Sequence, residues 1–204
     1  MLTLMVLLLA ATAVLADGIP DLDGSYAVCA YDGPGQATVM NFPDGAGSSF
    51  TESLDPDGNV VDATITLVVL DWNDFPIPDF PMEDIWLESA DGGLVPCMGG
   101  STADSNTDMN GETKWVNPLR AGGSSEALCQ VLINGNAIYH PVGLPISFNS
   151  PDINADGQVN IADLGLFSTD YYNNYAFRSD FYRDGVLNLA DVACFAQGLA
   201  TSCP

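Results

Sequence analysis

Basic residues are scarce in this sequence. Four Lys and Arg stand against 27 Asp and Glu, which gives a formal net charge of −23 at pH 7. Phosphate backbones and anionic lipid surfaces repel such a chain, so nucleic acid and membrane surfaces are poor candidate partners. Solubility alone explains most of the scattered acidic residues. The acidic residues that cluster near the C-terminus need a further reason.

Catalytic side chains are scarce as well. His140 is the only histidine, and a lone histidine before a proline is an ordinary loop residue rather than the centre of a triad. A glycosidase would need two carboxylates that face each other across a cleft, and the spacing of the glutamates selects no such pair. The candidates are Glu52, Glu83, Glu88, Glu112 and Glu126. We therefore expect a protein that is not an enzyme.

The cysteines lack the spacing of a metal site or of a CxxC motif. They are Cys29, Cys97, Cys129, Cys194 and Cys203. An exported chain tends to oxidise its cysteines, and an odd number cannot all pair internally. Two pairings are hypotheses: Cys194 with Cys203, which would clip the C-terminal tail, and Cys97 with Cys129. The alternative is that buried, unpaired cysteines act as small apolar residues.

Long apolar runs are absent after the N-terminus. Residues 1–16, MLTLMVLLLAATAVLA, are apolar throughout, with small residues Ala13 and Ala16 before the polar Asp17. This run is short for a membrane span and ends like a cleavage site, so it predicts a secretory signal peptide, although no Lys or Arg precedes it. We expect a mature protein that begins near Asp17, is secreted or held at the cell surface, and does not insert into a membrane.

Residues 17–149 show a strand pattern. Short apolar stretches alternate with turn pairs such as Asp57-Gly58, Asn110-Gly111 and Asn134-Gly135. In DATITLVVL, alternate residues from Ala63 to Val69 share an apolar face, which is typical of an antiparallel strand with one face on a core. The pattern predicts a β-sandwich. The predicted strands are YAVCAY, ATVMNF, DATITLVVL, DIWLES, ETKWVN, EALCQVLIN and LPISF.

The order of three segments adds a resemblance. The run ATITLVVLDWNDFPIPDFPMEDIWL is followed by TDMNGETKWV and then by AGGSSEALCQVLING. Over residues 60–137 this order resembles the bacterial immunoglobulin-like domains of invasin and intimin-type surface proteins. Asp74 and Asp79 stand where that family usually has glycine, but Asp tolerates such backbone positions. The resemblance implies an Ig-like spacer or adhesion module with no catalytic residues.

The three tryptophans leave an alternative open. Trp86 and Trp115 lie in apolar strand runs and are predicted to be core residues, whereas Trp72 lies in the turn DWNDF. An exposed indole ring there would stack on a sugar ring. The alternative function is therefore a carbohydrate-binding protein associated with polysaccharide degradation, with a polysaccharide as partner.

Near the C-terminus an acidic motif occurs twice. DINADGQVNIAD, residues 152–163, recurs as DFYRDGVLNLAD, residues 180–191. Both have the spacing of a calcium loop, with oxygen-bearing residues at alternate positions and a glycine in the sixth for the sharp turn. The first loop would supply Asp152, Asn154, Asp156, the carbonyl of Gln158, Asn160 and Asp163. The second would supply Asp180, Asp184, the carbonyl of Val186, Asn188 and Asp191.

The two predicted calcium sites are unequal. The third position of the second loop is Tyr182, which cannot reach a metal as a short Asn can, and the cationic Arg183 follows it. A water molecule would then fill the gap. We expect two calcium ions, with the second bound more weakly.

The surroundings of the loops refine this prediction. A full EF-hand has an entering helix, but here LPISFNSP precedes the first loop and reads as a strand, while IADLGLFSTDYYN and LADVACFAQGL predict exit helices. Two such halves, with Asp rather than Glu at the last loop position, resemble a type I dockerin over residues 152–200. That resemblance implies two antiparallel helices and docking to a cohesin-like receptor or another extracellular protein. The recognition positions would be Ile161, Ala162, Ser168, Thr169, Leu189, Ala190, Ala196 and Gln197.

The expected fold is therefore mainly β, an Ig-like β-sandwich at residues 17–149 followed by a small α-helical dockerin-like module of paired calcium loops at residues 150–204. The expected function is calcium-dependent assembly of proteins outside the cell.

Overall fold

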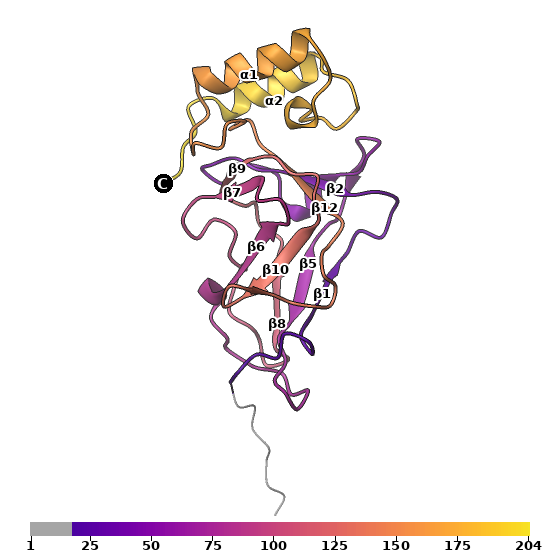
Figure 1. Ribbon diagram of the computed structural model, residues 1–204, viewed down its shortest axis with the longest axis vertical. Helices are drawn as coiled ribbons and strands as arrows, with labels where there is room; N and C mark the ends of the chain where they lie inside the picture. Colours follow the sequence, from indigo (N-terminus) through magenta and orange to yellow (C-terminus); the bar gives the residue numbers. More distant parts are fainter. Residues whose placement is uncertain (1–17) are drawn as a thin grey trace, which may run out of the picture.

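The computed structural model describes residues 18–204, so the predicted signal peptide lies outside the described residues. The described chain is mainly β, with strands in several small sheets and two α-helices. The helices sit at one end of an elongated body, and the described chain begins at the opposite end (Figure 1). Within residues 18–204, no helix is both long and apolar enough to cross a membrane.

Every predicted strand stretch contains a strand. These strands are β1 (Tyr26–Cys29), β2 (Ala37–Met40), β5 (Ile65–Val68), β6 (Ile85–Ser89), β8 (Glu112–Trp115), β10 (Cys129–Ile133) and β12 (Ile146–Asn149). The sequence did not predict the short strands β3 (Ser53–Leu54), β4 (Val60–Val61), β7 (Leu94–Pro96), β9 (Ala121–Gly123) and β11 (Asn136–Ala137). Short 3-10 turns are η1 (Phe50–Glu52), η2 (Met82–Asp84) and η3 (Phe177–Ser179). The helices α1 (Ile161–Tyr172) and α2 (Leu189–Gly198) lie where exit helices were predicted.

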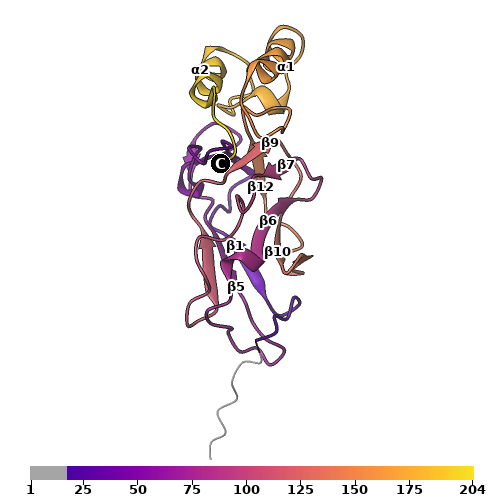
Figure 2. The same cartoon turned by 90° about the vertical axis from the view of Figure 1, so that its left-hand side faces the viewer.

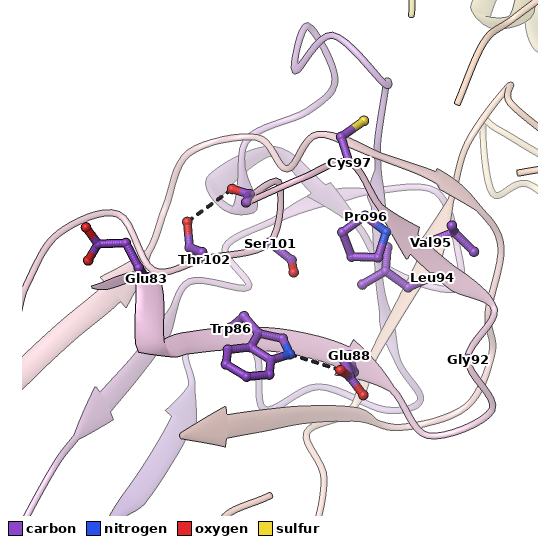
Figure 3. Close-up of a pocket in the computed structure, with 11 residues that line it drawn as sticks. Glu83, Trp86, Glu88, Gly92, Leu94, Val95, Pro96, Cys97, Ser101 and Thr102 are labelled. Carbon is purple, nitrogen blue, oxygen red and sulfur yellow. Dashed lines mark hydrogen bonds between the residues drawn. The ribbon is translucent and has the colours of Figure 1, made fainter. Parts of the chain in front are cut away.

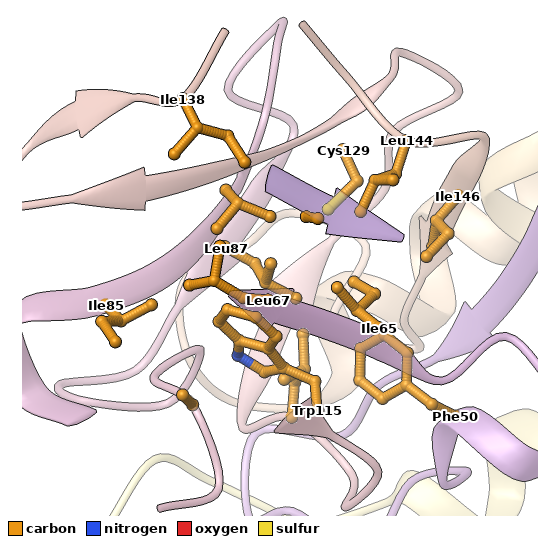
Figure 4. Close-up of a cluster of buried hydrophobic side chains, with 14 of the residues drawn as sticks. Phe50, Ile65, Leu67, Ile85, Leu87, Trp115, Cys129, Ile138, Leu144 and Ile146 are labelled. Atoms are coloured by element: carbon orange, nitrogen blue, oxygen red, sulfur yellow. The ribbon is translucent and has the colours of Figure 1, made fainter. Parts of the chain in front are cut away.

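Two antiparallel sheets share the main core. One has the order β1-β5-β8, with Ile65 opposite Trp115, and the other has the order β11-β10-β6, with Val131 opposite Leu87. Figure 4 shows side chains of both sheets meeting in one apolar cluster. The predicted apolar face of the strand around Ile65 is confirmed, because its alternate residues from Ala63 to Val69 are fully buried. Burial of each large apolar side chain of this kind stabilises the fold by about 1.5–3 kcal/mol.

The two strand tryptophans have different environments. Trp115 is fully buried, and its indole N–H donates to the carbonyl of Ser101 at 3.0 Å, so its predicted place in the core is confirmed. The prediction for Trp86 was wrong. On β6 the buried residues are Ile85 and Leu87, so Trp86 lies on the opposite face of the strand, where it is half-buried.

A third sheet lies at the end of the β-domain that is next to the helices. Its order is β12-β2-β3-β4, and β12 runs parallel to β2. β12 ends at Asn149, just before the first acidic loop, so the strand predicted to enter that loop is confirmed. The two-stranded sheet of β7 and β9 lies below the same loop (Figure 2).

Asp74 and Asp79 adopt left-handed backbone conformations. Their φ angles are 60° and 56°. These are the positions where the resemblance to bacterial immunoglobulin-like domains called for glycine, and Asp tolerates this region better than most residues. The departure from glycine is therefore compatible with the backbone.

The disulfide bond joins Cys97 to Cys203, so both predicted pairings were wrong. Helix α2 ends at Gly198, after which the tail runs back along the first acidic loop to the β-domain, where Cys203 meets Cys97. Cys129 is buried in β10, and Cys194 packs in the aromatic cluster under the helices. The free thiols among the described residues are those of Cys29, Cys129 and Cys194.

Candidate metal centre

The two acidic loops share one backbone geometry. Their sixth positions are Gly157 and Gly185, with φ angles of 84° and 76°, a region that strains any residue with a side chain. The fourth positions, Ala155 and Arg183, are also left-handed, with φ angles of 59° and 58°. The repeat in the sequence is therefore a repeat in the structure.

The first carboxylate of each loop accepts a hydrogen bond from the sixth residue. The N–H of Gly157 donates to Asp152 Oδ2 at 2.9 Å, and the N–H of Gly185 donates to Asp180 Oδ2 at 3.0 Å. Each bond closes the sharp turn across the loop. The first carboxylate is thereby held at the centre of the loop, which is where a calcium loop places its first ligand.

The last carboxylate of each loop is held just as symmetrically. Asp163 accepts from the N–H of Asn154, and Asp191 accepts from the N–H of Tyr182, both at 3.1 Å. Each also accepts from the N–H three residues before it, at 2.9 Å in both loops. These contacts tie the start of each helix to its own loop.

Capping boxes begin both helices. The side chain of Asn160 accepts from the N–H of Ala162 at 2.8 Å, and that of Asn188 accepts from Ala190 at 2.7 Å. Asp163 and Asp191 complete the boxes. The same residues that would ligate a metal thus also start the helices.

Four loop carboxylates are buried. Asp152, Asp163 and Asp191 are fully buried, and Asp180 is 1% exposed. Burial raises the pKa of Asp152 to about 6 and also raises the pKa of Asp191, because desolvation penalises the charged form. No salt bridge reaches any of the four within residues 18–204. Buried charges without a counter-charge are costly, so these loops have the electrostatic demand of a cation site.

One buried oxygen in the second loop has no partner. Asp180 Oδ2 accepts hydrogen bonds from Gly185 and from the hydroxyl of Tyr175 at 2.9 Å, whereas Asp180 Oδ1 has no hydrogen-bond partner in the described structure. Native proteins rarely leave a buried polar atom unpaired unless an ion or water completes it. The donor set of carboxylates, amides and carbonyls fits calcium, a hard cation that prefers oxygen.

The predicted calcium ligands include Asn side chains and backbone carbonyls as well as carboxylates. Residues 18–204 contain no group of three or more His, Cys, Asp or Glu side chains that could hold a metal ion. Asn154, Asn160 and the carbonyl of Gln158 make up half of the first loop's predicted ligands. Calcium binding in these loops therefore stays a prediction.

Tyr182 and Arg183 leave the second loop incomplete. Tyr182 is among the residues that line a hollow with Met40 of the β-domain, and its side chain has no carboxylate or amide oxygen to supply at the third position. The guanidinium of Arg183 lies 4.6 Å over the ring of Phe177, and its Nη1 is 3.7 Å from Glu126 Oε1. The guanidinium of Arg183 therefore interacts with groups outside the loop. The second loop lacks an oxygen ligand at its third position, but the positive charge of Arg183 does not take the place of the metal ion.

Both loops are attached to the β-domain. The N–H of Gly123 in β9 donates to the carbonyl of Asp152 at 2.8 Å. The side-chain amide of Asn149, at the end of β12, donates to the carbonyls of Phe177 at 2.8 Å and Asp180 at 3.0 Å. Sequence reasoning missed these supports. The only signal was the run AGG before EALC, which reads equally well as a turn.

The predicted recognition residues lie on the outer surface of the helices. Ile161 and Leu189 are 78% and 77% exposed, which is unusual for such large apolar residues. Beneath them the rings of Phe167 and Phe195 stack 5.5 Å apart. Ala162, Thr169, Ala196 and Gln197 are exposed, and Ser168 and Ala190 are half-buried.

A shallow hollow runs between the two helices, which lie side by side (Figures 1 and 2). Its volume is about 230 Å³. It is lined by Leu164, Phe167, Ser168, Tyr171, Tyr172, Leu189 and Val192. Together with Ile161 these residues make an apolar surface on an otherwise acidic protein, and we call it the helix face.

The residues considered for catalysis are scattered over the β-domain, except that two glutamates line the same pocket. His140 is an exposed loop residue whose Nε2 lies 3.1 Å from Asp23 Oδ1. Glu112 pairs with Lys114, and Glu126 lies next to Arg183. Glu83 and Glu88 line one pocket of the β-domain.

Trp72 is 67% exposed, so the predicted exposed ring is present on the turn. The alternative of sugar stacking therefore rests on this one ring.

Comparisons with known proteins give little beyond this geometry. No family model and no curated protein sequence matches the chain. A solved structure described as the crystal structure of the Lin-41 filamin domain is similar at a TM-score of 0.30 and 15% identity. The match covers 65% of this chain and 97% of that one. At that TM-score it carries no argument, so the mainly β architecture stands on the chain's own strands and sheets.

Proposed function

We propose that this chain is a secreted, non-catalytic calcium-binding protein that assembles with another extracellular protein through its helix face. The two loops would bind calcium, and the β-domain would carry the module as an Ig-like spacer or adhesion unit. The observation that carries the proposal is the unpartnered, buried Oδ1 of Asp180, within a loop whose sixth residue donates to the first carboxylate just as in the first loop. The disulfide bond between Cys97 and Cys203 favours an oxidising compartment.

Calcium would act through the residues that connect loop and helix. Asp163 and Asp191 hold the N-terminal ends of α1 and α2, so an ion bound at these carboxylates would stabilise both helices. Helices of this length are marginal by themselves. The helix face would then be ordered only when the loops are loaded, and binding to the partner would depend on calcium.

The exposed apolar residues favour a protein partner. Ile161 and Leu189 occupy equivalent positions, just after the ninth residue of each loop, and Leu189 lines the hollow between the helices. A cohesin-like receptor with an apolar patch would bury both side chains. The helix face offers no cationic side chain, since all four Lys and Arg lie elsewhere, so contact with anionic surfaces is disfavoured.

Calcium is tested by titration of the EDTA-treated full chain. We expect calcium to raise the melting temperature and to bind at two ions per chain, with different affinities. Asp152→Asn and Asp180→Asn keep the shape of each first ligand but remove its charge, so each should remove one of the two ions. Absence of any change in melting or circular dichroism on addition of calcium would refute the proposal.

The partner is tested by capture from the secreted and surface fraction of the source organism, with calcium and with EDTA. We expect a bound protein that Ile161→Asp and Leu189→Asp each release. Met109→Asp is the matched control, because Met109 is 80% exposed on the β-domain and far from the helix face in sequence. Capture that ignores calcium, or that Met109→Asp abolishes equally, would contradict the proposal.

A second function has one observation in its favour. Trp72 is exposed within a turn, where its ring could stack on a polysaccharide. Retention on insoluble polysaccharide that Trp72→Ala abolishes would establish this alternative. Retention that survives the change would remove it.

A further inference from the structure

The β-domain contains a pocket whose lining includes no residue of the two acidic loops or of the helix face. Its volume is about 440 Å³, and it lies between β6 and the segment that runs from β7 to Thr102 (Figure 3). Its lining is Glu83, Trp86, Glu88, Gly92, Leu94, Val95, Pro96, Cys97, Gly99, Ser101 and Thr102.

Trp86 forms the base of this pocket in a fixed orientation. Ile85 and Leu87 of β6 face the core, so Trp86 and Glu88 face the pocket together. The indole N–H of Trp86 donates to Glu88 Oε1 at 2.9 Å (Figure 3). The far edge of the ring lies near Gly135 in the turn after β10. The indole thus presents a held aromatic surface with a carboxylate beside it.

Neither carboxylate at the pocket forms a salt bridge within residues 18–204. Glu88 has one acceptor position used by Trp86, and Glu83 has no partner among the described hydrogen bonds and salt bridges. The lining holds no Lys or Arg. Three of the four cations pair with carboxylates elsewhere: Lys114 with Glu112, Arg178 with Asp170, and Arg183 with Glu126. Arg120 donates to the carbonyl of the lining residue Gly99 at 3.3 Å, but it makes no salt bridge with Glu83 or Glu88. A carboxylate beside the tryptophan face, with a second one at the other end of the pocket, therefore attracts a cation.

We propose that this pocket binds the ammonium or guanidinium group of a Lys or Arg side chain on a partner protein. The cation would lie over the Trp86 ring and pair with Glu88, while Glu83 at the other end of the pocket would add to the negative field (Figure 3). The net charge of −23 would steer basic ligands toward the surface. Val95, which is 40% exposed, and the adjacent Met98, which is 97% exposed, supply apolar area for the rest of a bound peptide. A neutral sugar would gain stacking here but no charge interaction.

Indole N–H signals in a ¹⁵N–¹H spectrum of the full chain test this. The chain has three tryptophans, and Trp86→Phe assigns the signal of interest. Acetylated tripeptides Ala-Arg-Ala and Ala-Lys-Ala should shift the Trp86 signal, whereas Ala-acetyllysine-Ala should not. Trp72 is an internal control, because it is exposed beside acidic residues but lies outside the pocket. Glu88→Gln keeps the acceptor for the indole and removes the charge, so it should weaken binding by about twofold to fivefold.

Each contrary outcome overturns the proposal. Equal shifts at Trp72 and Trp86 would mean diffuse attraction to an acidic protein. Unchanged affinity in both Glu88→Gln and Glu83→Gln would remove the carboxylates from recognition. A shift caused by a neutral hexasaccharide and by neither basic peptide would identify a sugar site instead. Affinity for the basic peptides should also fall as salt is raised from low ionic strength, since exposed charges are screened. This test is independent of calcium and of the helix face.

Discussion

The carboxylate of Asp152 occupies the space that a side chain at Gly122 would need. A Cβ on Gly122 would overlap Asp152 Oδ2, and the next residue, Gly123, donates its N–H to the carbonyl of Asp152 at 2.8 Å. Asp152, the first predicted ligand of the first loop, therefore packs directly against β9. The loop and the β-domain form one packed unit at this point.

Gly122→Ala should disturb the packing of Asp152 on β9. The added methyl group must displace either Asp152 or β9, and overpacking of this kind costs about 1–3 kcal/mol of unfolding free energy. Chemical denaturation measures the loss, and calcium titration should show a weaker first site with an unchanged second site.

Gly165→Ala is the matched control for that change. A Cβ at Gly165, within α1, meets nothing within 4 Å, and Ala in a helix interior is favoured over Gly by about 0.5–1 kcal/mol. This variant should be slightly more stable than the parent chain. Equal effects of the two substitutions would contradict the close packing of Gly122 on Asp152.

The disulfide bond between Cys97 and Cys203 should contribute strongly to stability. It closes a loop with a sequence separation of 106 residues, and a loop of that size is expected to gain up to about 4–5 kcal/mol from restriction of the unfolded chain. The paired change of Cys97→Ser and Cys203→Ser should lower the free energy of unfolding by about 2–5 kcal/mol. Thermal melting with and without reductant gives the same comparison on the unaltered chain.

Two further measurements check this pairing. Peptide mapping without reduction should recover Cys97 and Cys203 in one cross-linked species. Cys194→Ser should change the melting temperature much less than loss of the disulfide bond, because Cys194 is a half-buried free thiol. A cross-link between Cys194 and Cys203 would show the pairing described here to be wrong.

The loop geometry was predictable because it depends on local residues. Gly157 satisfies the backbone of its own turn, and Asn160 caps the helix that starts beside it. Both contacts are made within the repeat, so the motif alone specifies them. The same holds for the strand around Ile65, whose alternation was enough to identify its buried face.

Contacts between distant segments were not predictable in this way. Nothing local in the sequence indicates that Cys97 meets Cys203, or that the first loop rests on Gly122. Trp86 is a different case. The alternation of Ile85 and Leu87 with Trp86 already placed the indole on the outer face of β6, but the apolar character of the run favoured a core assignment.

Tyr182→Asn should strengthen the second calcium site. Tyr182 stands where the first loop has Asn154, and it lines a hollow together with Met40 of the β-domain. Asn would restore the missing oxygen ligand, which we expect to raise affinity by about tenfold, the equivalent of about 1.4 kcal/mol. Calorimetric titration resolves the two sites. Tyr182→Ala is the control, since it removes the ring without adding a donor, and a similar gain in that variant would disprove the explanation.

Asp170 and Arg178 should make stability depend on acid pH outside the loops. Arg178 donates to Asp170 through Nε at 2.7 Å and through Nη2 at 2.9 Å, and Ser179 donates to the same carboxylate at 2.8 Å. These bonds hold the pKa of Asp170 below its ordinary value of 3.8. A depressed pKa adds stability that is complete above the unfolded-state pKa and is lost as pH falls through the folded-state pKa.

Asp170→Asn should therefore lower the free energy of unfolding most at neutral pH. We expect a loss of about 1–2 kcal/mol there, because the bonds removed are charge-assisted and Asp170 is nearly buried. The gap between variant and parent should narrow as pH falls below 3.8, because the unfolded chain takes up its proton there first and the folded carboxylate follows at its lower pKa. Glu112→Gln is the control. It breaks the exposed pair with Lys114, so its effect should stay within about 0.5 kcal/mol. Denaturation curves across acid pH would contradict this account if the two variants lost stability equally, or if the cost of Asp170→Asn did not change with pH.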